Sequence, residues 1–262
     1  MSPEGPPRSA DFVQSLERGL AVIRAFDADH REMRLSEVAA VTGLTRAAAR
    51  RFLLTLAELG YVRHENGRFS LRPRVLDLGY AYLSGLSFAE IAQPQMEGLV
   101  RQLNESSSIS VLDDTEIVYV VRVPTRRIMS ITLAVGTRLP AYATSMGRVL
   151  LAQLDDEELG ERLARIKPRK LTPHTITAKR ALRVELEAVR EQGYAMVDQE
   201  LEEGLRSAAV PIRDAAGKVA ALNISVHASR ASMDDLRRSY LPVVQETAAE
   251  IERDLRGTAG VN

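Results

Sequence analysis

Residues 35–72 read LSEVAAVTGLTRAAARRFLLTLAELGYVRHENGRFSLR, and this stretch decides the fold of the first part of the chain. Apolar residues recur every three or four positions over residues 35–42 and again after Thr45, as on the buried faces of two helices. Gly43 suits the C-cap of the first helix, and Thr45 suits the N-cap of the second. Two short helices joined by such a turn are typical of a helix-turn-helix.

A β-hairpin is predicted directly after the two helices. Residues 61–65 and 68–71 flank the dipeptide Asn66-Gly67. This dipeptide favours a two-residue hairpin turn, because both turn positions need a positive φ. Helix, turn, helix and hairpin together predict a winged helix.

A further helix is predicted at residues 12–26, before the helix-turn-helix. Its expected buried residues are Leu16, Leu20 and Ile23. The polar residues 27–34 are predicted to form a loop, and residues 1–10 a disordered tail. The winged helix-turn-helix domain is therefore expected over residues 11–73.

Arginines are concentrated in this unit. Between residues 44 and 74 seven arginines stand against two glutamates, whereas the whole chain has 35 basic and 35 acidic residues. Such an excess indicates binding to double-stranded operator DNA, with the second helix in the major groove. The predicted DNA contacts are Thr45, Arg46, Ala47, Arg50, Arg51, Arg63 and Arg68. The alternative is a basic face that binds a protein; the arginines of the hairpin favour DNA because they suit phosphates.

The composition limits the class of protein. The chain of 262 residues is long enough for two domains. It has no cysteine, which excludes thiolate catalysis, disulfides and zinc sites with cysteine ligands. No long apolar run and no signal-peptide pattern is present, so we expect a cytoplasmic protein without a membrane partner.

A linker helix is predicted over residues 74–92, after Pro73. Its apolar residues fall on two sides: Val75, Leu78, Tyr82 and Leu86 on one, and Leu76, Tyr80 and Leu83 on the other. One side is expected to pack on its own domain and the other on a second subunit, because both cannot stay in water. Burial against the C-terminal domain alone is the alternative. Since an operator with two half-sites needs two copies of the DNA-binding domain, we expect a homodimer or a dimer of dimers.

Residues 93–257 are predicted to form an α/β effector-binding domain with a curved, mostly antiparallel sheet, similar to a GAF domain, so the fold class is α+β. Strands are expected near residues 108–113, 117–123, 128–135, 194–198, 206–213 and 218–227. Helices are expected near residues 95–104, 145–154, 155–166, 178–192 and 233–255.

Alternation along the last two strands separates an apolar face from a polar one. The apolar face holds Ala208, Val210, Ile212, Leu222, Ile224 and Val226 and is expected to carry helices. The polar face holds Ser207, Asn223, Ser225 and His227, and it either lines a pocket or is hydrated. The loop at residues 143–147 offers backbone N–H groups at a helix N-terminus, which favour an anion; an ordinary capped helix is the alternative.

Three stretches resemble the IclR family of transcriptional regulators: SLERGLAVI at 15–23, LPAYATSMGR at 139–148 and DQELEEGLRS at 198–207. They are most similar to the branch that controls aromatic-acid catabolism through protocatechuate and the β-ketoadipate pathway. The resemblance runs from about residue 12 to residue 256. It implies a winged helix, a linker helix and an effector domain, assembled as dimers or dimers of dimers.

The resemblance also implies where the effector, a protocatechuate-like or β-ketoadipate-like carboxylate, binds. Together with the polar face, it gives the predicted effector site Thr144, Ser145, Met146, Gly147, Asp198, Arg206, Ser207, Asn223 and Ser225. The family pattern has Asp or Ser where this chain has Val197, and a shift by one residue turns a strand side chain to the other face. Whether Asp198 or Arg206 faces the pocket therefore stays open, and Arg206 could instead pair with Glu200 or Glu202.

An enzyme domain that acts on a small carboxylate, fused to a DNA-binding module, is the alternative function. The four histidines, at positions 30, 64, 174 and 227, are far apart. No spacing typical of a Ser-His-Asp triad, a metal pair or a glycine-rich phosphate loop is present. The sequence therefore predicts a regulator, with no enzymatic activity, no cofactor and no metal site.

Overall fold

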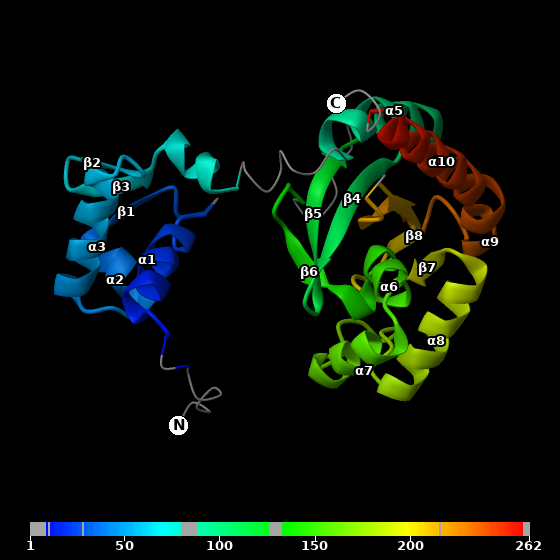
Figure 1. Ribbon diagram of the computed structural model, residues 1–262, viewed down its shortest axis with the longest axis horizontal. Coiled ribbons are helices and arrows are strands. Elements are labelled where there is room, and N and C mark those ends of the chain that lie inside the picture. The colour runs from blue at the N-terminus through cyan, green and yellow to red at the C-terminus, as the bar shows by residue number, and fades with distance from the viewer. Residues whose placement is uncertain are drawn as a thin grey trace. The chain divides into compact units, whose positions relative to one another are not determined.

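The chain divides into two units, residues Met1–Ser84 and Gly85–Asn262, and each is described by itself (Figure 1). The structure is a computed structural model that describes residues 9, 11–27, 29–79, 88–125, 133–214 and 216–258.

The first unit is a winged helix-turn-helix, as predicted. Its elements are α1 (Gln14–Arg24), β1 (Glu32–Arg34), α2 (Leu35–Thr42), α3 (Arg46–Glu58), β2 (Val62–Glu65) and β3 (Arg68–Leu71). Gly43 ends α2 with a φ of 66°, and the Thr45 hydroxyl caps α3 by accepting the Ala48 N–H at 3.2 Å. Asn66 and Gly67 have φ values of 51° and 74°, as a tight hairpin turn requires. The sequence signals of turn and cap are therefore confirmed.

Two local predictions for this unit are wrong. Residues 32–34 form strand β1, which pairs with β3, rather than part of a loop. The strand forms because Met33 is buried in the core of the unit, while its polar neighbours stay outside. In α1, the predicted core residues Leu16 and Leu20 are exposed by 63% and 48%, whereas Ile23 packs against the core as predicted and Val22 is buried in it. An apolar surface is thereby left on α1.

The start of the predicted linker helix is a 3-10 turn, η1 (Pro73–Leu76), followed by helical backbone at residues 77–79. Leu76 and Leu78 are exposed within the first unit. Tyr80, Tyr82, Leu83 and Leu86 lie outside the described residues.

Helix α5 (Phe88–Leu103) runs through Pro94, so the prediction that a new helix begins after this proline is wrong. Pro94 has no N–H, so the Glu90 carbonyl receives no helical hydrogen bond from it. Both residues are exposed, so water can bind this carbonyl instead. Ala92, Met96 and Leu99 are buried at helical spacing. Their burial stabilises the helix across the proline.

The second unit contains a six-stranded sheet of order β6-β5-β4-β9-β8-β7, in which each pair is antiparallel. The strands are β4 (Ser106–Asp113), β5 (Glu116–Val123), β6 (Arg138–Pro140), β7 (Ala195–Asp198), β8 (Leu205–Arg213) and β9 (Val219–His227). The predicted α+β class and antiparallel sheet are confirmed. Of the strand predicted near 128–135, residues 128–132 lie outside the described part of the chain, and residues 133–135 do not form a strand.

Helices cover both faces of this sheet. They are α5, η2 (Ala141–Ala143), α6 (Ser145–Ala152), α7 (Asp156–Arg165), α8 (Lys179–Gln192), α9 (Met233–Asp235), the π-type turn η3 (Leu236–Tyr240) and α10 (Leu241–Thr258). α5 and α10 lie side by side on one face (Figure 1). α6 packs on the other face and shares an apolar core with α7 and α8. No described helix has the length and apolar composition that a membrane span needs.

The two sheet faces differ as the alternation predicted. The six residues predicted for the apolar face of β8 and β9 are all buried, and α10 packs against these strands. The other face carries Ser207, Asn223 and Ser225 and lies toward α6. This polar face and the start of α6 together form the site described next.

Candidate effector site and DNA interface

The start of α6 is shaped by the turn before it. The Thr144 hydroxyl caps the helix and accepts the Gly147 N–H at 3.1 Å. A Cβ added to Gly147 would lie 2.2 Å from the carbonyl oxygen of Ala141, so glycine alone lets the turn fold back on the helix. Ser145 and Met146 are thereby brought to the polar face of the sheet.

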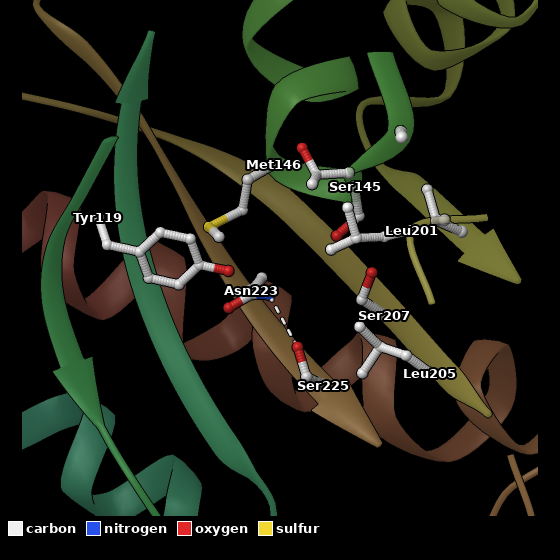
Figure 2. Close-up of a pocket in the computed structure, with 11 residues that line it drawn as sticks. Tyr119, Ser145, Met146, Leu201, Leu205, Ser207, Asn223 and Ser225 are labelled. Carbon is white, nitrogen blue, oxygen red and sulfur yellow. Dashed lines mark hydrogen bonds between the residues drawn. The ribbon is translucent and has the colours of Figure 1, made fainter. Parts of the chain in front are cut away.

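A small hollow, with a cavity volume of about 20 Å³, lies between the start of α6 and the sheet (Figure 2). Its lining residues come from the α6 region, the strands and one loop: Ala143, Thr144, Ser145, Met146, Tyr119, Val197, Leu205, Ser207, Asn223, Ser225 and Leu201. Leucines and valine give it an apolar wall, and hydroxyls and an amide give it polar ends. This composition is typical of a site for a small molecule.

The Asn223 amide and the Ser225 hydroxyl in the hollow are oriented by hydrogen bonds. The Asn223 amide accepts the Ser108 N–H at 3.0 Å and donates to the Ser225 hydroxyl at 3.1 Å. By contrast, the Ser145 hydroxyl is buried and has no hydrogen-bond partner among the described residues. A buried unpaired hydroxyl costs about 1–3 kcal/mol. Such a group is expected where a ligand or water completes the site.

Tyr119 is a lining residue that the sequence analysis missed. Its hydroxyl points toward the interior of the hollow (Figure 2). Burial raises the pKa of Tyr119 to about 12, against the opposing effect of Arg122. The phenol therefore stays protonated at neutral pH and can donate a hydrogen bond to a ligand oxygen.

Six of the nine predicted effector residues line the hollow: Thr144, Ser145, Met146, Ser207, Asn223 and Ser225. Gly147 is not among the lining residues, and its N–H is already bound by Thr144. The predicted free N–H at this position is therefore wrong.

Asp198 and Arg206 are not brought to the hollow. They pair across β7 and β8, one position beyond the pair Val197–Ser207, and strand alternation turns them to the other face. Arg206 Nε lies 2.7 Å from Asp198 Oδ1, so the pairing of Arg206 with Glu200 or Glu202 is also wrong. Burial raises the pKa of Asp198, but the hydrogen bonds from Arg206 and Gln199 and the charge of Arg206 together outweigh it, so the pKa is lowered. Val197 occupies the position that faces the hollow.

A buried ion pair fixes the loop that carries Leu201. Arg148 is 1% exposed, and its Nη2 lies 2.6 Å from Glu200 Oε2. Arg148 Nε also donates to the Tyr142 carbonyl at 3.1 Å, and Glu200 accepts the Ile176 N–H at 2.8 Å. The pair thus joins α6 to the loop after β7, on either side of the hollow.

The candidate DNA interface lies on α3 and the wing. Arg46, Arg50, Arg51 and Arg68 are exposed, and none forms an ion pair with a described residue. Arg63 is exposed and approaches only the Glu65 carboxylate, at 3.6 Å. These guanidinium groups are available to phosphates and base edges. Thr45 serves as the α3 cap, and Ala47 is exposed beside the arginines.

Two family patterns match the chain. The pattern described as IclR helix-turn-helix domain matches residues 15–66, and that of the bacterial transcriptional regulator IclR C-terminal domain matches residues 80–253. The chain belongs to the IclR family of bacterial transcriptional regulators. The resemblance found in the sequence is confirmed. Within the part of the chain that the structure describes, no group of three or more His, Cys, Asp or Glu side chains could hold a metal ion.

Within the IclR family, the chain is similar to several named proteins and solved structures. The Pca regulon regulatory protein of Pseudomonas putida is 44% identical over 249 residues, covering 94% of this chain and 86% of that protein. A transcriptional-regulator structure from Rhodococcus sp. RHA1 is 56% identical, with a TM-score of 0.83, and covers 96% of this chain and 100% of that one. An IclR homolog from Microbacterium hydrocarbonoxydans, solved in complex with 4-hydroxybenzoate, is 26% identical with a TM-score of 0.82, covering 93% and 100%. The relatives are named as regulators, so the predicted regulator class is confirmed over the enzyme alternative.

Proposed function

We propose that this IclR-family regulator binds an operator in duplex DNA and responds to a small carboxylate effector, so that it controls genes of aromatic-acid catabolism. The observation that supports this most directly is the buried Ser145 hydroxyl at the start of α6, which has no hydrogen-bond partner within the described part of the chain. It lies in a hollow with Tyr119, Ser207 and Asn223. These groups suit a compact acid with further hydroxyl or keto oxygens.

In the proposed complex the effector carboxylate lies at the N-terminus of α6. The Ser145 hydroxyl and the backbone N–H groups of Ser145 and Met146 donate to it, and the helix terminus favours its charge. The neutral Tyr119 phenol, Ser207 and Ser225 bind the remaining oxygens. Asp198 and Arg206 have no part in this complex, because they neutralise each other away from the hollow.

The chemical class of the effector is supported by the relatives. The Pseudomonas putida relative is named for the Pca regulon, and the Microbacterium relative was solved with 4-hydroxybenzoate. We therefore propose an aromatic acid, or a dicarboxylic acid from its degradation, as the effector of this chain.

The proposed DNA complex has α3 in the major groove. Arg46 and Arg50 contact base edges, and Arg51, Arg63 and Arg68 contact phosphates. The chain assembles as a homodimer or a dimer of dimers, because an operator with two half-sites needs two copies of α3. Since a bacterial chromosome lies in the cytoplasm, the proposal places the regulator there.

The experiment that tests the effector site is a thermal-shift titration with 4-hydroxybenzoate, protocatechuate and 3-oxoadipate, each beside its methyl ester. A ligand at 100 times its Kd stabilises the folded state by about 2.7 kcal/mol. We expect one of the acids, and not its ester, to raise the unfolding temperature. Ser207→Phe, which fills the hollow, should abolish the shift and leave operator affinity unchanged, while Ser207→Ala is the matched control that leaves the hollow open. A shift that survives in Ser207→Phe, or a preference for the ester, would contradict the proposed site.

A further inference from the structure

A β-bulge in β5 turns an arginine onto the polar face of the sheet. Between β4 and β5, Ser110 pairs with Tyr119, whereas Ile109 pairs with Val121 and Ser108 with Arg122. Val120 is therefore an extra residue in β5. In a regular strand Tyr119 and Arg122 would lie on opposite faces, because they are an odd number of positions apart. The bulge brings both to the face of Ser108 and Ser110.

Among the described residues of this face, no carboxylate serves as a counter-ion of Arg122. It is half-buried, and burial lowers the pKa of its guanidinium, which the neighbouring Tyr119 opposes. None of the described carboxylates pairs with it within 4.0 Å. Its Nη1 makes a long contact of 3.4 Å with the Ser108 hydroxyl. Residues 126–132, which follow β5, contain no Asp or Glu in their sequence.

Arg148 and Arg206, which lie on elements that contribute residues to the hollow, differ from Arg122. Arg148 on α6 pairs with Glu200, and Arg206 on β8 pairs with Asp198. Both cations are thus neutralised by the protein itself. A half-buried guanidinium without a carboxylate gains most from an acidic ligand, because its planar fork can bind both oxygens of a carboxylate.

Ser108 connects Arg122 to the hollow by hydrogen bonds. The Ser108 hydroxyl contacts Arg122, and the Ser108 N–H is bonded to the Asn223 amide, which lines the hollow. Ser110, two residues along the same strand, contacts the Met146 sulfur at the other side. The polar face therefore extends from the start of α6, past Tyr119 and Asn223, to Arg122.

We propose that Arg122 forms a second anion subsite, so that the effector is an acid with two separated carboxylates. This inference rests on the proposed function, in which the first carboxylate lies at the start of α6. The second carboxylate binds the Arg122 guanidinium, and Tyr119 and Asn223 contact the oxygens between the two ends. A monocarboxylate leaves Arg122 without a partner and binds more weakly.

The test is calorimetric titration of the full chain with adipate and with its monomethyl ester, which differ by one negative charge. Wild-type protein should bind adipate at least about tenfold more tightly, as expected for one charged hydrogen-bonded contact. Arg122→Gln should weaken adipate binding by about 10- to 100-fold and leave the monoester unchanged. The matched control is Arg138→Gln on β6, since Arg138 already pairs with Asp113 and Glu116. It should change neither affinity.

Several outcomes would overturn the second subsite. Equal wild-type affinities for the two probes would do so, and this comparison needs no variant to fold. Equal weakening of both probes by Arg122→Gln would show that Arg122 holds the single carboxylate or has a structural role, and an unchanged adipate affinity would exclude a contact. Binding of 4-hydroxybenzoate without binding of adipate would overturn the diacid and leave the proposed function standing. If neither adipate nor the acids of the thermal-shift series binds, the proposed function fails as well.

Discussion

At the scale of single residues, Gly147 and Ser145 have opposite effects on the stability of the start of α6. Gly147 is needed for packing, because any Cβ there would meet the backbone of Ala141. Ser145 is buried without a hydrogen-bond partner among the described residues, which costs stability until a ligand or water binds. Gly147 therefore positions the helix, and in the proposed complex the Ser145 hydroxyl donates a hydrogen bond to an oxygen atom of the effector.

We expect Gly147→Ala to destabilise the second unit by about 3 kcal/mol or more, because the added methyl group cannot be accommodated without moving the turn. Urea unfolding, followed by far-UV circular dichroism, measures this. Gly160→Ala is the control, since its Cβ would meet nothing nearer than the Arg183 guanidinium at 3.9 Å. That change should stabilise α7 by up to about 1 kcal/mol. Equal effects of the two substitutions would contradict the close approach at Gly147.

Tyr119 should make the stability of the second unit depend on pH in the alkaline range. Its folded-state pKa of about 12 lies above the ordinary value of 10.0, so its contribution is complete below pH 10 and is lost as the pH rises toward 12. At pH 11 the loss is about 1.4 kcal/mol. Tyr119→Phe should remove this part of the decline between pH 9 and pH 11. Parallel declines in wild type and Tyr119→Phe, measured by urea unfolding at both pH values, would show that the phenol is not buried.

At the scale of elements, sequence motifs correctly predicted those features that are formed by residues close together in the chain. The cap at Thr45 and the turn at Asn66-Gly67 are formed by residues close in sequence, and both were predicted correctly. Strand β1 was missed because three residues have too short a pattern to recognise, and the strand exists only through pairing with β3. The β5 bulge was missed for the same reason, since a register shift depends on the partner strand.

The sequence likewise predicted only those residues of the candidate site that a local pattern places. Alternation placed Ser207, Asn223 and Ser225 on one face, and the capping pattern placed Ser145 at a helix terminus. Tyr119 could not be found in this way, because its face depends on the bulge. Asp198 was misplaced because the family pattern suggested a role that strand alternation gives to Val197. Hydrophobic lining residues such as Leu201 have no sequence signal that separates them from core residues.

Helix α3 and the wing should contribute differently to DNA binding. We expect Arg50→Ala to cost about 1–3 kcal/mol on the specific operator and to relax sequence preference, because Arg50 faces the bases in the proposed complex. Arg68→Ala should weaken all sequences alike and reduce the salt slope by about one, because it removes one phosphate contact. Fluorescence anisotropy with operator and random DNA at several salt concentrations measures both. Equal loss on the two DNAs for both variants would exclude these roles.

At the scale of the whole molecule, effector binding changes transcription only if it favours one arrangement of the DNA-binding units. A ligand shifts such an equilibrium by its differential affinity for the two arrangements and by no more. Leu16, Leu20, Leu76 and Leu78 are exposed on the first unit, and we propose that the exposed leucines of η1 and the helical residues after it contact a second subunit.

The proposed subunit contact can be tested at Leu78. If Leu78 lies between two subunits, Leu78→Glu places a carboxylate in an apolar interface and should give monomers that bind the operator poorly, because each monomer contacts one half-site. Sedimentation velocity of wild type and variant measures the oligomeric state. Val184→Glu is the matched control, since Val184 on α8 of the second unit is an apolar residue with a similar exposure, 61% against 53% for Leu78. Unchanged sedimentation of Leu78→Glu would exclude Leu78 from the interface, whereas dissociation by Val184→Glu alone would place the interface on the second unit.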